Sequence, residues 1–376
     1  MSDTQRLVIL GTGHIAHRHA TEFARDPRCR MVAAVDLNAD RARAFAERYD
    51  IPHVFGDLEA ALRWGAFDAA VNATPDAAHK PTTLALLADG KHVFCEKPLA
   101  LTGPDAYAMA EAAEAANRLN MVNFTYRNAH AIQMARTMVA SGSIGAVRHL
   151  EASYLQSWLS AGHWGDWRTE ERWLWRLSTS HGSNGVLGDL GVHLFDFVSF
   201  GTGLAFGTLV ARLKTFGKAP DDRIGEYLLD ANDSVAITAE MSNGALCALH
   251  MSRFATGNLN DLNLAVFGDA GALRIWANHL DSRLHACLGD DRETQTWRLL
   301  TCPPTPRNEI RFATALATGA NGEPDFRRAA DIQTLIDLCT ASDADGRWRE
   351  VAPVSAAAPA SRLEIEAGDE PRAPGG

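Results

Sequence analysis

Two short motifs carry side chains that could move a proton during the oxidation of an alcohol. Lys97 follows a predicted buried strand, at the edge of the sheet where ligands of open α/β proteins bind. Asp189 and His193 stand four residues apart in a predicted helix and would share one face. A histidine titrates near neutral pH, and a nearby carboxylate can fix its tautomer. The pattern indicates that Lys97 and His193 converge on one hydroxyl, although a surface lysine and a core histidine remain open alternatives on spacing alone.

A glycine turn near the start of the chain could bind a pyrophosphate. The run GTGHIA, from Gly11 to Ala16, follows a predicted strand and opens a predicted helix. Gly11 would allow a tight turn, Gly13 would let a phosphate approach the backbone, and the small Ala16 would let helix and strand pack. The helix N-terminus supplies free N–H groups and the positive end of its dipole. We therefore expect Gly11, Gly13, His14 and Ile15 to bind a dinucleotide.

Asp36 strengthens this interpretation and favours one dinucleotide. It ends the second predicted strand, about 20 residues after the glycine turn, where a carboxylate can hold the hydroxyls of an adenosine ribose. With Asp36 present, a glycine turn that binds no nucleotide is the less favoured interpretation. Since a carboxylate would repel a 2′-phosphate, Asp36 also favours NAD over NADP. Arg41 and Arg43 keep NADP open, unless they simply lie on a solvated helix face.

The first third of the chain alternates short apolar runs with helical patterns. Such alternation is typical of βαβ units and a parallel sheet, so we predict an α/β fold with a Rossmann dinucleotide-binding domain, a doubly wound parallel sheet, over residues 1–127. The predicted strands are Arg6–Leu10, Met31–Val35, His53–Phe55, Phe67–Ala73, His92–Cys95 and Met121–Phe124. The predicted helices are His14–Arg25, Asn38–Tyr49, Leu58–Trp64, His79–Ala88 and Pro104–Leu119.

After about Arg127 the pattern changes, because strands now follow one another through Asn-Gly or Gly-containing turns. This is typical of an antiparallel sheet, and we predict an α+β substrate-binding domain over residues 128–352. The tail over 353–376 is rich in Ala, Pro, Ser and charge, and we expect it to be disordered. The predicted helices are Ala131–Ala140, Leu187–Phe200, Glu309–Thr318 and Phe326–Ser342. The predicted strands are Ala146–Gln156, Leu209–Lys214, Ser234–Met241, Ala245–Met251, Leu262–Phe267 and Ala272–Ile275.

A tryptophan-rich segment in this second domain could line a substrate site. Aromatic faces pack against the C–H faces of sugars, and an indole N–H can donate to a hydroxyl. We therefore expect Gln156, Trp158 and His163 to contact substrate, although a packed loop or a subunit contact would also explain the tryptophans. No arginine cluster favours a phosphate, which indicates a neutral sugar, sugar lactone or cyclitol. The tryptophans of the segment are Trp158, Trp164, Trp167, Trp173 and Trp175.

Composition and charge exclude several other classes of function. The 376 residues carry a formal net charge of −10 and no long basic run, so we expect no nucleic-acid partner. No stretch approaches the roughly 20 apolar residues that span a bilayer, and no export signal opens the chain, so we expect no membrane association and a cytoplasmic location. The six scattered cysteines argue against disulfides and structural zinc. We also expect no metal at His14, His17 and His19, because the last two cannot share a helix face.

Six short motifs make the chain resemble the Gfo/Idh/MocA oxidoreductases, which include inositol and glucose–fructose oxidoreductases. They occur in the family's order, and the resemblance covers the chain to about residue 350. Together the motifs are specific for the family, whereas each motif alone is not. Two departures, Gly182-Ser-Asn-Gly185 for a glycine triplet and His130 for a proline, lie near the expected substrate and bear on its identity. The motifs are GTGHIA at Gly11–Ala16, ATP at Ala73–Pro75, EKP at Glu96–Pro98, YR at Tyr126–Arg127, WR at Trp175–Arg176 and DLGVHLFD at Asp189–Asp196.

The resemblance implies a fold, a catalytic group and a cofactor site. A Rossmann domain would precede a domain with a large open, mainly antiparallel sheet, which often supports homo-oligomers of two or four subunits. Lys97, Asp189 and His193 would form the catalytic group and contact substrate, with His193 as the general base. Arg127 would join the substrate contacts. The residues expected along the cofactor are Thr74, Pro75, His79, Glu96, Lys97 and Arg176.

The leading hypothesis is an NAD(P)-dependent oxidoreductase that transfers a hydride between nicotinamide and a hydroxyl carbon of a sugar, anhydrosugar or cyclitol. In the oxidative direction His193 would take the proton of a hydroxyl that also contacts Lys97. One alternative is an NAD-dependent glycoside hydrolase of the same fold, in which reduced cofactor would not accumulate. Another is an NAD-binding sensor without turnover, which would have no need of the three catalytic residues.

Overall fold

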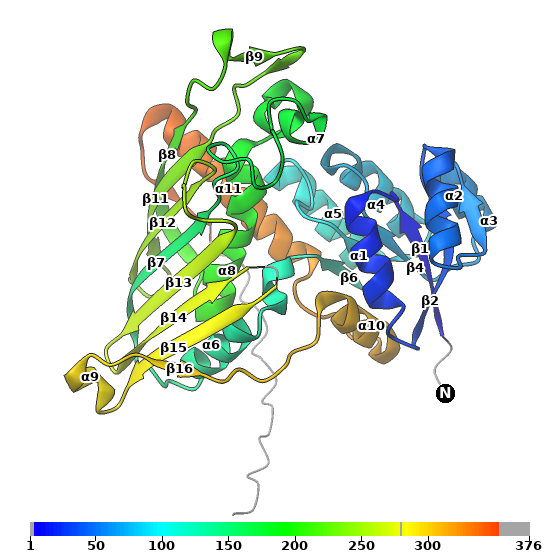
Figure 1. Cartoon of the computed structure of the whole chain (residues 1–376). Helices are drawn as coiled ribbons and strands as arrows, with labels where there is room; N and C mark the ends of the chain where they lie inside the picture. Colours follow the sequence, from blue (N-terminus) through cyan, green and yellow to red (C-terminus); the bar gives the residue numbers. More distant parts are fainter. Residues whose placement is uncertain (1–3, 279, 353–376) are drawn as a thin grey trace, which may run out of the picture.

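The chain folds into two domains, each built on one large sheet (Figure 1). The computed structural model describes residues 4–278 and 280–352. The predicted tail over 353–376 lies outside the described residues. The two large sheets differ in kind, because one is parallel and the other is mainly antiparallel.

The N-terminal sheet has six parallel strands in the order β3-β2-β1-β4-β5-β6, which confirms the predicted doubly wound Rossmann fold. β1 pairs with both β2 and β4, so the strand order reverses beside β1, where such folds bind ligands. The strands are β1 Gln5–Leu10, β2 Cys29–Val35, β3 His53–Phe55, β4 Ala69–Asn72, β5 His92–Cys95 and β6 Asn120–Val122. The helices are α1 His14–Phe23, α2 Ala39–Arg48, α3 Leu58–Trp64, α4 His79–Ala88 and α5 Gly103–Ala115.

The C-terminal sheet has nine strands in the order β16-β15-β14-β13-β7-β12-β11-β8-β17. β7 and β12 run parallel, and the other neighbouring strands pair antiparallel, so the predicted mainly antiparallel sheet is confirmed. A short hairpin, β9 Arg223–Ile224 and β10 Tyr227–Leu228, stands apart from it. The strands are β7 Val147–Leu155, β8 Phe206–Lys214, β11 Ser234–Met241, β12 Leu246–Ser252, β13 Asp261–Gly268, β14 Gly271–Ala277, β15 Ser282–Leu288, β16 Arg298–Leu300 and β17 Arg349–Glu350.

One face of this sheet is covered by helices, and none of the described helices covers the other face (Figure 1). The covering helices are α6 His130–Ala140, α8 Val192–Thr202 and α11 Phe326–Asp345. The sequence of β11 fits this arrangement, because its buried residues alternate with exposed ones. The helices lie between the sheet and the Rossmann domain, so the core of the second domain faces the first.

The segment after the large sheet returns to the first domain. Helix α10, Asn308–Thr318, packs against α1 and β1. Its Phe312 is fully buried, and the centroid of its ring lies 5.5 Å from that of Phe94 in β5. Residues far along the chain therefore complete the core beneath the cofactor helix, a contact that periodicity along the sequence does not indicate.

The predicted helix Leu187–Phe200 is interrupted at its start. Residues Leu187–Gly191 form a π-helical turn, and the regular helix α8 begins at Val192. A π-helical turn holds an extra residue and is found most often at functional sites. Asp189 lies in this turn and His193 lies just after it, so their relative placement differs from that on a regular helix.

Several short elements were not predicted from the sequence. The edge strands β16 and β17 have three and two residues, and they exist because neighbouring strands offer hydrogen bonds to them. Helix α5 ends at Ala115 rather than at Leu119, because Asn117 adopts a left-handed conformation with φ 51°. No described helix has the length and apolar character needed to cross a membrane. Each of the six cysteines carries a free thiol.

Candidate active site

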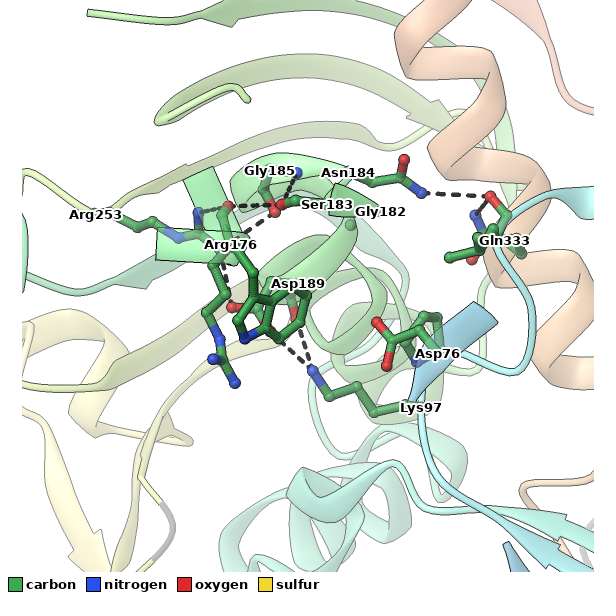
Figure 2. Close-up of a pocket in the computed structure, with 14 residues that line it drawn as sticks. Asp76, Lys97, Arg176, Gly182, Ser183, Asn184, Gly185, Asp189, Arg253 and Gln333 are labelled. Carbon is green, nitrogen blue, oxygen red and sulfur yellow. Dashed lines mark hydrogen bonds and ion pairs between the residues drawn. The ribbon is translucent and has the colours of Figure 1, made fainter. Parts of the chain in front are cut away.

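A pocket lies where the carboxyl end of β5 meets the π-helical turn of the second domain (Figure 2). Lys97 follows β5 and extends toward Asp189 in the π-helical turn. Arg253 follows β12 and approaches Asp189 from the other side. The pocket is therefore lined by both domains and contains several charged side chains. Its charged and amide side chains include Asp76, Lys97, Arg176, Asn184, Asp189 and Arg253.

Asp189 is held between two cations. The Nζ atom of Lys97 lies 2.9 Å from its Oδ1, and the Nη2 atom of Arg253 lies 3.0 Å from its Oδ2. Burial alone would raise the pKa of Asp189, but Lys97 and Arg253 outweigh burial and hold that pKa far below its usual range. Burial alone would lower the pKa of Lys97, and Asp189 more than offsets this, so its pKa is raised. Both groups are charged at neutral pH.

His193 lies near this pair, but its surroundings favour the neutral form instead of the charged form. Burial lowers the pKa of His193 to about 3, and the ammonium of Lys97 adds to the effect. The Nδ1 atom of its ring is buried and has no hydrogen-bond partner among the described residues. The rings of Tyr126 and Tyr154 pack around it, with centroids 5.1 and 6.3 Å away. The imidazole is thus neutral at pH 7 and can accept a proton.

The structure brings Lys97 and Asp189 into contact and keeps His193 nearby, without a hydrogen bond to either among the described residues. It also adds Arg253, which the sequence analysis missed. The side chain of Arg253 is fully buried, and it also donates to the carbonyl of Arg176 over 3.0 Å. A lone arginine directly after an apolar strand was the available signal, but nothing in the sequence links it to Asp189.

The glycine turn fits a bound pyrophosphate. Gly11 has a φ of +85°, and a Cβ atom there would stand 2.6 Å from the carbonyl oxygen of Ala73, so a side chain cannot be accommodated. A Cβ atom on Gly13 would meet nothing within 4 Å. No described side chain caps the N-terminus of α1, whose N–H groups therefore face this space. Next to it His14 is exposed and Ile15 is half-buried.

Asp36 is already crowded with donors. Its carboxylate accepts from the N–H and hydroxyl of Thr12, each at 2.8 Å, and from the N–H of Asn38 at 2.9 Å. The guanidinium of Arg41 adds two bonds of 3.0 and 2.7 Å. Burial raises the pKa of Asp36, but these donors, Arg41 above all, bring it down to about 2. Asp36 thus ties the glycine turn to the end of β2 and keeps its negative charge.

The other residues expected along the cofactor divide into two groups. Thr74 is half-buried, Pro75 is exposed, and Arg176 lines the pocket with its guanidinium 4.5 Å from the ring centroid of Trp175. His79 and Glu96 lie beneath the loops instead. His79 is fully buried, and both of its ring nitrogens lie within hydrogen-bond distance of backbone carbonyl oxygens. It has no ring nitrogen left for a cofactor, which corrects the expected direct contact.

Besides His193, four residues expected to contact substrate lie outside the pocket. Gln156 and Trp158 are buried and bond to each other, and Gln156 also donates to Asn260 over 2.7 Å. Arg127 is buried in a two-bond ion pair with Asp196. These polar groups are buried and paired within the fold, and none of them lines the pocket. His163 is exposed and does not belong to the residues that line the pocket.

The tryptophan-rich segment is mostly a packed lobe. The rings of Trp158 and Trp173 stack with centroids 5.1 Å apart, and those of Trp164 and Trp173 with centroids 6.1 Å apart. Trp167 is also buried. Trp175 is half-buried like Trp164 and Trp173, but it is the one of these five tryptophans that lines the pocket. Most of these tryptophans therefore pack against one another. Trp175 provides the aromatic surface beside the charged residues of the pocket.

Two family models match the chain, one on each domain. Residues 5–124 match the model described as "Oxidoreductase family, NAD-binding Rossmann fold". Residues 132–274 match the model described as "GFO/IDH/MocA C-terminal domain".

Individual proteins show similarity over nearly the whole chain. A levoglucosan dehydrogenase of Pseudarthrobacter phenanthrenivorans is 24% identical, with 93% of this chain and 98% of that protein covered. The crystal structure of an oxidoreductase domain protein from Kribbella flavida is 28% identical, with 94% and 100% covered and a TM-score of 0.80. A 1,5-anhydro-D-fructose reductase of Ensifer adhaerens is 31% identical, but only 51% of this chain and 55% of the reductase are covered.

Proposed function

Because the chain belongs to the Gfo/Idh/MocA family of NAD-binding oxidoreductases, we propose that it transfers a hydride between NAD and a hydroxyl-bearing carbon of a sugar, an anhydrosugar or a cyclitol. The observation that carries this proposal is the juxtaposition of a charged Lys97–Asp189 pair and a neutral, buried His193 beside one pocket. An alcohol oxidation needs both a hydrogen-bond donor for the reacting oxygen and an acceptor for its proton.

Each residue then has a distinct role. The ammonium of Lys97 donates a hydrogen bond to the reacting oxygen and stabilises the negative charge that develops there. His193 accepts the hydroxyl proton at a ring nitrogen, for which its lowered pKa keeps it in the neutral form. Asp189 keeps Lys97 charged and oriented, and Arg253 in turn holds Asp189. NAD, when bound, supplies the redox chemistry by taking up the hydride at its nicotinamide ring.

The cofactor would lie along the carboxyl ends of β1, β4 and β5. Gly11, Gly13 and the uncapped start of α1 would hold the pyrophosphate, with His14 and Ile15 beside it. Asp36 would accept from the adenosine ribose in place of one of its present donors, such as Arg41, and its negative charge disfavours the 2′-phosphate of NADP. Thr74, Pro75 and Arg176 would flank the nicotinamide half.

The substrate class is argued from relatives and from the pocket. Relatives are named for levoglucosan, 1,5-anhydro-D-fructose and inositol, which are uncharged and rich in hydroxyls, and one relative is named for glucose 6-phosphate. Trp175 beside the pocket offers an aromatic face for such a ring. The amide of Asn184 and the carboxylate of Asp76 offer polar groups for its hydroxyls. Anhydrosugars and cyclitols are therefore the first compounds to test.

The test is absorbance at the reduced-nicotinamide band, with NAD and separately with NADP, against inositols, aldoses, anhydrosugars and glycosides. Reduced NAD that grows in proportion to one polyol is the expected result. Cleavage of a glycoside without net reduction would favour the NAD-dependent hydrolase instead. Cofactor binding without turnover across the whole panel would contradict the proposal and favour a sensor.

The open face of the nine-stranded sheet supports a second proposal, that the protein is a homo-oligomer. A shallow hollow on this face is lined by residues of β7, β12, β13, β14 and β15, among them His250, Arg274 and Trp276. Exposed Leu246 adds apolar surface. Light scattering after gel filtration should give two or four times 40.7 kDa, and a charged substitution such as Ala265→Glu should reduce it. A cytoplasmic location stays a prediction.

A further inference from the structure

We propose that two buried histidines, His19 and His79, are permanently protonated and act as positioning residues that fix the backbone on either side of Lys97. The inference rests on the proposed function for its catalytic consequence, but the charge state of the two rings can be tested without any turnover. Both histidines are fully buried, and they belong to two different helices of the Rossmann domain. They bond to the residues on either side of Lys97, which are Glu96 and Pro98.

His19 lies between two carboxylates. Its Nε2 atom is 2.8 Å from Oε1 of Glu96, and its Nδ1 atom is 2.9 Å from Oε1 of Glu309. Glu96 precedes Lys97, whereas Glu309 comes from α10 near the end of the described chain. Helix α10 therefore supplies one of the two carboxylates that hold His19.

His79 lies between two backbone carbonyls. Its Nδ1 atom is 2.7 Å from the oxygen of Pro98, and its Nε2 atom is 2.9 Å from the oxygen of Thr74. These carbonyls belong to the two loops that follow β4 and β5. His79 is the first residue of α4, so one ring joins a helix start to both loops.

The hydrogen-bond partners set the charge of each ring. A neutral imidazole has one N–H donor and one acceptor nitrogen, whereas an imidazolium has two donors. A carbonyl oxygen can only accept, so His79 satisfies both contacts only when it is protonated at both nitrogens. The same holds for His19 between two ionised carboxylates. In a neutral ring, the nitrogen without a proton would face an oxygen atom, lone pair to lone pair. Such a buried, unpaired contact is unfavourable.

The polar and charged groups around each ring agree with this assignment. Burial lowers the pKa of His19, but Glu309 and Glu96 outweigh it and raise the pKa to about 9. Burial likewise lowers the pKa of His79, but Cys95, Asp76 and the Pro98 carbonyl raise it to about 10.

The opposing carboxylates keep their charge. Burial would raise the pKa of Glu96, and His19 brings it down to about 2, with help from Asn123 and Lys97. The pKa of Glu309 is also lowered, chiefly by His19 against the effect of burial, with a smaller effect of Arg18.

These contacts continue to the backbone of Lys97. Oε2 of Glu96 accepts the backbone N–H of Lys97 over 3.0 Å, while His19 and Asn123 hold Oε1. On the other side His79 holds the carbonyl of Pro98. The peptide unit before Lys97 is therefore anchored by His19 through Glu96, and the peptide unit after Pro98 is anchored directly by His79. Since a displacement of about 1 Å in a reacting group can cost on the order of 100-fold in rate, this anchoring bears on turnover.

The first test is the charge state of the wild-type protein. The fourteen histidines can be labelled with ¹⁵N in their rings and observed by NMR at pH 8, where an ordinary histidine is neutral. We expect two rings with the shifts of imidazolium and with slowly exchanging N–H protons. If all rings are neutral at pH 8, the proposal is wrong, whatever reaction the protein catalyses.

The second test compares turnover with binding and folding. His19→Gln and His79→Gln each keep one donor and remove the charge. We expect kcat to fall by about tenfold or more for each, with KM and NAD affinity nearly unchanged, and the matching imidazolium signal to vanish. His17→Gln on the same helix and Lys80→Gln beside His79 are the matched controls, because these side chains bond to Tyr49 and Asp105 instead of to the residues around Lys97.

A structural role alone predicts a different outcome. It would lower the melting temperature of the variants and leave the kcat of the folded fraction unchanged, which would overturn the positioning role. Glu309→Gln separates the two histidines, since it should weaken the His19 contacts, lower kcat and leave the His79 signal in place. The NMR result decides the charge state of both rings even if no substrate is found, so failure of the proposed function and failure of this proposal are distinguishable.

Discussion

The ammonium nitrogen of Lys97 lies 2.9 Å from Oδ1 of Asp189, although 92 positions of the chain separate the two residues. The contact joins the end of β5 in the Rossmann domain to the π-helical turn of the second domain. Arg253 occupies the other oxygen of the carboxylate, so Asp189 links two cations at the pocket.

Lys97→Ala should abolish most turnover and spare cofactor binding. We expect kcat to fall on the order of 100- to 10,000-fold, because the reacting oxygen loses its charged donor. Initial rates of NAD reduction would measure turnover. Quenching of the protein's tryptophan fluorescence during titration with NAD would measure cofactor binding. Lys80→Ala is the control, since this lysine pairs with Asp105 on the surface of the same domain. A variant that loses NAD binding as well would identify Lys97 as a cofactor anchor.

Arg253→Met should destabilise the protein as well as the site. The side chain of Arg253 is fully buried and that of Asp189 is 31% exposed, so removal of the arginine leaves a partly buried carboxylate with fewer donors. Breaking such a pair costs about 3 kcal/mol of unfolding free energy. Urea unfolding followed by tryptophan fluorescence would measure the loss. The exposed pair of Arg212 and Asp343 offers Arg212→Met as a control, expected to cost less than about 1 kcal/mol.

The two glycines of the cofactor turn should respond differently to alanine. At Gly11 the new Cβ would meet the carbonyl of Ala73 at 2.6 Å with a φ of +85°, so Gly11→Ala should cost about 1–3 kcal/mol of stability and weaken NAD binding. At Gly13 the Cβ meets nothing within 4 Å. Gly13→Ala should leave unfolding within about 0.5 kcal/mol of wild type and still weaken NAD binding, because the methyl enters the phosphate space. Thermal unfolding with and without NAD distinguishes the two variants. If both variants lose the same stability without NAD, the prediction that only Gly11 is sterically restricted is wrong.

The lowered pKa of His193 should make the fold sensitive to acid. In the unfolded chain this histidine takes up a proton near pH 6.5, whereas in the fold burial and Lys97 delay uptake to about pH 3. The unfolded state therefore binds more protons between these values, and stability falls as the pH drops from about 6.5 to 3. His193→Leu should reduce this fall. Unfolding free energies measured at pH 7.5, 6 and 4.5 would check it, and an unchanged slope in the variant would assign the acid sensitivity to other groups.

Much of the first domain could be predicted from local pattern. The apolar runs of β1 and β5 and the helical spacing of α3 and α4 specify elements, because side-chain periodicity follows the backbone of each element. Gly11 could be recognised for a similar reason, since a tight turn with positive φ requires a residue without a Cβ. Lys97 could be placed at the site because the carboxyl ends of parallel strands meet at one edge of the sheet.

The sequence by itself thus determined the cofactor fold, the glycine turn and the motifs that identify the family. Only the tertiary structure decided which distant residues meet. It pairs Arg253 with Asp189, brings Glu309 to His19, and turns Gln156 into the core instead of toward substrate. The physical reason is that periodicity and turn chemistry act over a few neighbours, whereas the partner of a buried charge is set by how whole elements pack.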